Sequence, residues 1–198
     1  GTLRVGTIDT AALDQGAGPL AAFRTAHPDV AVTLVVEGSV GLSSRVADGE
    51  LDMAVVVCPN PAIDLQYIDA QRWYDEPLRI YPAHPGSDPE SWGPWVTYPQ
   101  GSQTRRLIEE ALARRGLAME VVAESSNPDV LRQMVHLGVG SCVLPVGVAE
   151  RGPVPLQPAE TEPLISRPLA VIRRREALAN PARDAFVALL MQSDDGPS

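Results

Sequence analysis

The chain has few of the residues on which catalysis and metal binding usually depend. Its 198 residues include only two cysteines and three histidines. It contains no C-x-x-C, H-E-x-x-H, G-x-S-x-G or P-loop pattern, so nothing in the sequence supports an enzyme or a bound cofactor. No apolar run is long enough to cross a bilayer, and no basic-then-apolar signal precedes the first strand-like residues. We therefore expect a cytoplasmic, non-enzymatic protein with no membrane partner.

The two cysteines favour buried thiols rather than a redox switch. Cys58 and Cys142 lie far apart in apolar, strand-like runs, as is common for reduced cysteines in a reducing compartment. A redox-sensing pair would need both thiols exposed and close together.

A shortage of positive charge excludes nucleic-acid binding by the chain as a whole. The formal net charge is −9, whereas binding to DNA requires a basic face that neutralises phosphates. Two arginine clusters, at residues 114–115 and 173–175, do not alternate with aromatic residues. We interpret them as solvated charges at the ends of helices or strands.

The first half of the chain alternates between strand-like and helix-like segments. Nearly continuous apolar runs predict strands, and a 3.6-residue apolar period with stop signals predicts the helices between them. The predicted strands are residues 3–8, 30–38 and 51–57, and the predicted helices are residues 17–28 and 39–50. This βαβαβ pattern indicates a doubly wound α/β unit.

The second half repeats the alternation after a proline-spaced connection at residues 58–77. An extended segment at residues 78–85 is predicted to open it. Further strands are expected at residues 95–99, 119–125, 141–148 and 166–174, and helices at residues 104–115, 128–138 and 178–192. The fold class is therefore α/β, with two doubly wound α/β lobes joined by two crossing strands. Lobe I takes residues 1–77 and 168–198, and lobe II takes residues 78–167. Such a hinge creates a cleft that suits a small molecule.

Several motifs carry a family resemblance. The run Phe23-Arg-x-x-x-Pro-Asp-Val and the later run Gly49-Glu-Leu-Asp-Met-Ala-Val follow an opening LRVGTIDTAAL. EPLRIYPAHP, YPQGSQTRRLIEEAL and VLRQMVHLGVGSCVLP come next in order and spacing. The ordered set resembles the effector-binding (substrate-binding) domain of LysR-type transcriptional regulators over almost the whole chain.

The resemblance implies a type 2 periplasmic-binding-protein-like fold that binds a small effector between its lobes to control DNA-dependent transcription. It also implies an N-terminal winged helix-turn-helix domain, absent from this chain, through which alone DNA is bound. The acidic charge of this chain is then no contradiction. The alternative function is a solute-binding receptor of a transport system with the same two-lobed fold.

The resemblance also implies which residues hold the effector. They come from the loop after the first strand, the start of the second helix, the loop before the second lobe's first helix and the stretch before its next helix: Ile8, Asp9, Thr10, Gly38, Ser39, Val40, Gly101, Ser102, Gln103, Thr104, Ser126 and Asn127. Two helix N-termini facing one cleft would suit an anionic effector, because their backbone N–H groups are unpaired.

Local interpretations compete with a ligand role for several of these residues. Ser39 and Ser102 occupy positions typical of helix N-caps. Arg105 and Arg106, in the first turn of a helix, either meet an anion or point into water, and Arg105 is one turn from Glu109. Asp9 would disfavour a nearby anion and favour an amine or hydroxyl group. The charge of the effector therefore stays open.

The resemblance further implies self-association, as a homodimer or tetramer. In the family the first helix of lobe I packs against the first helix of lobe II of another copy. Leu20, Phe23, Leu107 and Ala111 are the candidate interface residues. The alternative is that they face the core of their own lobe.

Overall fold

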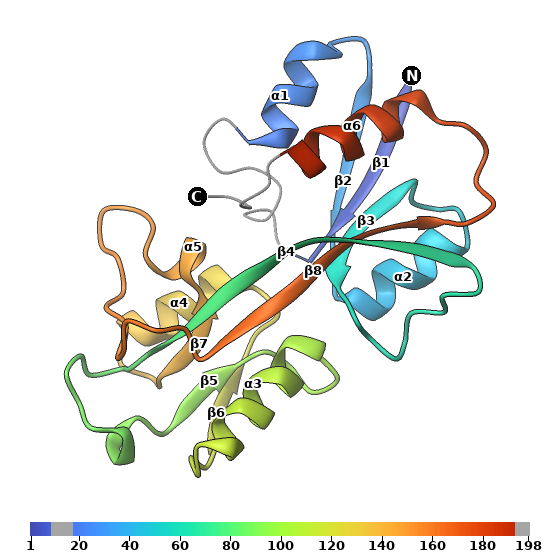
Figure 1. Ribbon diagram of the computed structural model, residues 1–198. Helices are drawn as coiled ribbons and strands as arrows, with labels where there is room; N and C mark the ends of the chain where they lie inside the picture. Colours follow the sequence, from blue (N-terminus) through green and yellow to red (C-terminus); the bar gives the residue numbers. More distant parts are fainter. Residues whose placement is uncertain (9–17, 193–198) are drawn as a thin grey trace. The chain divides into compact units, whose positions relative to one another are not determined.

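The computed structural model describes residues 1–8 and 18–192, which fold into two compact units (Figure 1). Unit 1 comprises residues 1–75 and 168–198, and unit 2 comprises residues 76–167. Two long strands, β4 (Ile68–Tyr81) and β8 (Ile165–Arg174), each contribute to both units.

Unit 1 is built around a parallel three-stranded core sheet, as the alternating pattern predicts. Strand β1 (Thr2–Thr7) lies between β2 (Ala31–Val36) and β3 (Met53–Val57). Val5 is in register with Leu34 on one side and with Met53 on the other. The outer edge of β3 pairs with β8 in the antiparallel direction.

Helix α2 (Ser39–Ala47) packs closely on one face of this sheet. A Cβ atom added to Gly6 would lie 2.6 Å from Leu42 and 2.8 Å from Leu51, so only glycine allows this approach. Leu42 and Val46 form a buried cluster with alternate residues of β3, among them Ala54 and Val56.

Helices α1 (Pro19–Ala26) and α6 (Pro181–Gln192) contact each other away from α2 (Figure 1). Phe23 and Phe186 are both fully buried and meet edge to face, with ring centroids 5.3 Å apart. This aromatic pair ties the first helix of the chain to the last.

Unit 2 combines a parallel strand pair with the ends of β4 and β8. Strand β5 is parallel to β6, and β4 pairs antiparallel with β7. Trp95, Ile108, Leu131 and Leu144 belong to its core. Its remaining elements, in chain order, are η2 (Pro89–Ser91), β5 (Trp95–Thr97), α3 (Gln103–Arg114), β6 (Val121–Glu124), α4 (Pro128–His136), β7 (Cys142–Pro145) and α5 (Val146–Ala149).

Two segments differ from the sequence-based expectation. Residues 68–77 are predicted as part of a connection, yet they form the start of β4. Its many polar side chains interrupt the apolar pattern that predicts a strand. One of them, Asp69, forms ion pairs with Arg173 and Arg175 of the described chain. Residues 141–148 are predicted as one strand, whereas β7 ends at Pro145 and α5 follows at once.

Candidate functional site

In unit 1, the candidate effector-binding residues follow the carboxyl ends of the parallel strands. Ile8 comes directly after β1, and its backbone N–H donates to Val55 of β3 at 3.2 Å. Gly38 lies between β2 and α2. Ligands of open α/β sheets bind at this edge, because loops and helix N-termini gather there. Asp9 and Thr10 lie outside the described residues.

Ser39 is not the N-cap that the sequence predicts. Gly38 takes the extended N-cap conformation and Ser39 is the first helical residue. The Ser39 side chain is buried, and its hydroxyl oxygen accepts a hydrogen bond from the backbone N–H of Val57 at 3.1 Å. Ser39 therefore fastens the start of α2 to the end of β3.

The start of α2 presents backbone N–H groups without a side-chain cap. No side chain in the described part of the chain caps the helix, and its first turn carries no acidic residue. Glu37 lies against Gly41, where a Cβ atom would collide with its carboxylate, and reaches Arg45 at 3.5 Å. Val40, by contrast, is exposed. The backbone N–H groups at the start of α2 therefore carry partial positive charge, and the Glu37 carboxylate beside them is paired with Arg45.

In unit 2, two candidate loops share the carboxyl edge of β5 and β6. Gly101, with φ +85°, turns the chain after β5 into α3. The Ser102 hydroxyl caps α3 by accepting from the backbone N–H of Arg105 at 3.3 Å, as predicted, and Gln103 is the first residue of the helix. After β6, Ser126 is exposed and Asn127 caps α4 by accepting from Asp129 at 2.9 Å.

Thr104 belongs to a buried polar cluster that sequence reasoning did not find. Its hydroxyl accepts a hydrogen bond from Arg167 at 3.0 Å. Arg167 also donates from Nε to the Glu76 carboxylate at 2.9 Å. Glu76 lies on β4 and Arg167 on β8, so one guanidinium joins both long strands to the first turn of α3.

Arg105 and Arg106 are both neutralised by carboxylates of unit 2, which answers the question of their role at a helix start. Arg105 is only 6% exposed and binds Glu109 at 2.7 Å and Glu124 at 2.6 Å. Arg106 is exposed and pairs with Glu110 at 3.0 Å. The hydrogen bond that the Arg105 guanidinium donates to Glu109 is the largest influence on its pKa and raises it. Arg105 therefore consolidates the fold of unit 2.

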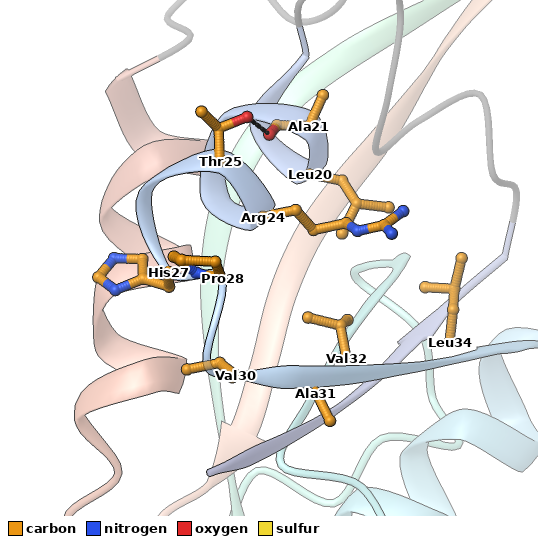
Figure 2. Close-up of a pocket in the computed structure, with 10 residues that line it drawn as sticks. All are labelled: Leu20, Ala21, Arg24, Thr25, His27, Pro28, Val30, Ala31, Val32 and Leu34. Atoms are coloured by element: carbon orange, nitrogen blue, oxygen red, sulfur yellow. Dashed lines mark hydrogen bonds between the residues drawn. The ribbon is translucent and has the colours of Figure 1, made fainter.

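The candidate interface residues are divided between surface and core. Phe23 and Ala111 are buried within their own units, whereas Leu20 and Leu107 are half-buried. Leu20 lines a groove of about 800 Å³ between α1 and the edge strand β2 (Figure 2). Val32 and Leu34 of β2 point toward the side of α1 that carries Leu20 and Arg24.

The thiols and the remaining ionisable groups show no metal site in the described part of the chain. Cys142 is fully buried and Cys58 half-buried, and both are free. Burial raises the pKa of both thiols. None of the helices in residues 1–8 and 18–192 is long and apolar enough to cross a membrane.

The amino-acid sequence matches a known family along nearly its full length. A family model described as the LysR substrate binding domain covers residues 1–195. The chain belongs to the LysR substrate-binding domain family. The family match favours the regulator over a solute receptor of a transport system.

Individual relatives agree with this assignment. An uncharacterised HTH-type transcriptional regulator of Shigella flexneri, YfeR, is 28% identical over 192 residues, covering 86% of this chain and 60% of the relative. The chain thus spans less than two thirds of that regulator's length.

Solved structures show the same fold at lower identity. The cofactor-binding domain of the Cbl transcriptional regulator superimposes with a TM-score of 0.80 at 22% identity, covering 97% of this chain and 88% of that chain. The effector-binding domain of QuiR in complex with shikimate gives 0.75 at 14% identity, covering 98% and 97%. The fold is therefore type 2 periplasmic-binding-protein-like.

Proposed function

We propose that this chain is the ligand-sensing domain of a LysR-type regulator, and that it acts by binding a small effector rather than by catalysis. The observation that carries the proposal is the shared placement of the candidate loops. In each unit they follow the carboxyl ends of parallel strands and open a helix, α2 in unit 1 and α3 in unit 2. These are the positions at which open α/β sheets bind ligands.

We propose a small organic anion as the effector. Among the described residues no side chain caps the N-terminus of α2, and the Glu37 carboxylate that lies against Gly41 is paired with Arg45, so the backbone N–H groups there favour a carboxylate or phosphate. Gln103 and Ser102 supply further donors at the start of α3. Shikimate, which the structurally similar QuiR domain binds, is itself a carboxylate.

We propose that regulation of transcription requires a DNA-binding domain outside this chain. The relatives YfeR and Cbl are HTH-type regulators longer than this chain, and the net charge of −9 opposes binding of DNA here. Effector binding would shift the equilibrium between arrangements of the two units only by its differential affinity for them. A cytoplasmic location follows from this role.

A thermal-shift screen of the chain tests effector binding. Small carboxylates, sugar phosphates, amino acids and amines would each be added, and a ligand at a hundred times its dissociation constant should stabilise by about 2.7 kcal/mol. Anions should stabilise the wild type and the control variant Ser44→Ala, which changes an exposed serine within α2. Ser102→Ala and Gln103→Ala should reduce the response. Stabilisation by amines alone would contradict the anionic effector.

We further propose that the chain forms a homodimer through the groove between α1 and β2. β2 is an edge strand, and its Val30, Val32 and Leu34 share one face beside Leu20 (Figure 2). These apolar residues share the groove with Arg24, Thr25 and His27, and a groove beside a sheet edge is a surface that a second copy would cover. Half-buried Leu107 of α3 is the proposed partner side of the contact.

Sedimentation velocity tests the dimer. Leu20→Glu should convert a dimer to a monomer, because it places a charge in the groove. Leu65→Glu is the matched control, since Leu65 is exposed elsewhere in unit 1. A monomeric wild type at high concentration, or equal behaviour of the two variants, would contradict this interface.

A further inference from the structure

A second cavity lies in unit 1, at the end of the sheet opposite the candidate loops. It has a volume of about 320 Å³ and is formed where β1 begins, where α2 leads into β3 and where β8 leads into α6. Parallel strands place their amino ends at one edge of a sheet and their carboxyl ends at the other. The cavity is therefore separate from the loops that hold Ile8 and Gly38.

The walls of this cavity carry an excess of positive charge. Arg4, Arg174 and Arg183 line it, against the single carboxylate of Asp52. Asp52 is already committed, because it accepts from the backbone N–H of Arg4 at 2.7 Å and from its guanidinium at 2.9 Å. Arg183 is likewise paired, with Asp184, so the positive charge of the cavity comes from Arg174, in a chain whose net charge is −9.

Within the described part of the chain, one of the other two arginines is paired with a carboxylate and the other is not. Arg183 is 7% exposed and binds Asp184 at 2.9 Å, so it forms a fixed wall. Arg174 is exposed, and no ion pair or hydrogen bond of its side chain is found among the described residues. It lies over Gly49, whose added Cβ would be 3.3 Å from the guanidinium. Glycine at φ +76° thus lets Arg174 rest against the backbone at the rim.

The remaining wall is apolar. Leu51, Ala177, Leu178 and Pro181 contribute to the lining. Leu178 is 87% exposed, so its side chain is available to a ligand. An open cationic rim beside an apolar wall fits an anion that carries a small apolar body.

We propose that this cavity is a second binding site, for a small organic phosphate or carboxylate with an apolar group. Arg174 supplies the charge that the anion neutralises, Arg183 and the Arg4–Asp52 pair form the polar wall, and Leu178 covers the apolar part of the ligand. The site is independent of the proposed effector loops in unit 2.

NMR titration of the ¹⁵N-labelled chain with inorganic phosphate and with phenyl phosphate tests this site. Backbone amide shifts should concentrate at Gly49, Asp52 and residues 178–180, and phenyl phosphate should bind more tightly than phosphate. Arg174→Gln should weaken both probes by about tenfold, the size expected for one charge-assisted interaction. Arg114→Gln, which changes an exposed arginine in unit 2, should leave both affinities unchanged.

A further variant separates the apolar contribution. Leu178→Asn should abolish the advantage of phenyl phosphate while keeping the affinity for phosphate, and the exposure of Leu178 makes a folding defect unexpected. Equal effects of Arg174→Gln and Arg114→Gln would overturn the proposal, as would absence of binding. Shifts confined to residues 101–104 would also overturn it, while supporting the proposed effector site.

Discussion

Replacing Arg167 by methionine should destabilise unit 2 strongly. The Arg167 side chain is 3% exposed and that of Glu76 is 8% exposed. The substitution removes the guanidinium from which the Glu76 carboxylate accepts at 2.9 Å and the Thr104 hydroxyl accepts at 3.0 Å. Breaking a buried ion pair by removing one partner costs about 3–5 kcal/mol, because the other charge keeps its desolvation penalty.

The prediction separates the ion pair from the hydrogen bond to α3. Thr104→Val removes only the hydroxyl and should cost about 1.5–3 kcal/mol, as expected for a hydrogen bond to a charged group. The double variant Glu76→Leu/Arg167→Met should be more stable than Arg167→Met alone, since it leaves no buried carboxylate behind. The destabilising effects of Glu76→Leu and Arg167→Met should therefore be strongly non-additive.

Urea unfolding followed by tryptophan fluorescence measures these differences, because unit 2 contains the buried Trp92 and Trp95. The exposed variant Arg106→Met, which breaks a surface ion pair in the same unit, is the control and should cost less than about 1 kcal/mol. An equally small loss for Arg167→Met would refute the reasoning, since it would mean that Glu76 and Arg167 do not depend on each other.

Three further predictions concern unit 1 and the thiols. Phe186→Ala should cost about 3–5 kcal/mol in urea unfolding, because it leaves a cavity beside Phe23 in the core. Burial alone would raise the pKa of Asp52, but hydrogen bonds and charge from its arginine neighbours outweigh it and lower that pKa. Its contribution to stability should be present above about pH 4, vanish as the pH falls through the depressed pKa, and be missing in Asp52→Asn. Cys58 should react with a thiol reagent in the folded protein faster than Cys142; equal rates would contradict their different burial.

The parallel core of unit 1 was predictable from the sequence because local and long-range forces agree there. Strand β3 is continuous in buried apolar residues, which is typical of parallel strands covered on both faces. Pro28 ends the preceding helical segment, and Gly49 follows α2 in a left-handed conformation. The helices and strands therefore appear in the expected order, with bounds that differ by a few residues.

The roles of individual polar residues were much less predictable. Serine is a residue type that commonly caps helices, yet the Ser39 hydroxyl accepts a hydrogen bond from the backbone N–H of Val57. Only the packed sheet brings Val57 near. The sequence leaves three interpretations of Arg105 open: a ligand contact, a solvated charge, or a pair with Glu109 one turn on. The structure buries it between Glu109 and Glu124, and the second of these lies 19 residues away.

The Glu76–Arg167 pair had no signal at all in local patterning. The two residues are 91 positions apart, and Glu76 falls among other charged residues in a segment that the sequence predicts as a connection. Only the fold, which brings β4 and β8 into the same unit, makes them partners. Sequence periodicity records which face of a strand is apolar, but it does not record which distant charge a polar residue will meet.

The most direct test of the proposed sensing function is hydrogen–deuterium exchange of the chain with an anion that stabilises it in the thermal-shift screen. The account predicts slower exchange in peptides that cover residues 38–43 of unit 1 and in peptides that cover residues 101–106 of unit 2, because both segments belong to the proposed effector loops. Unchanged exchange in both segments, or protection confined to residues 49–52 and 177–183, would contradict the proposed effector loops.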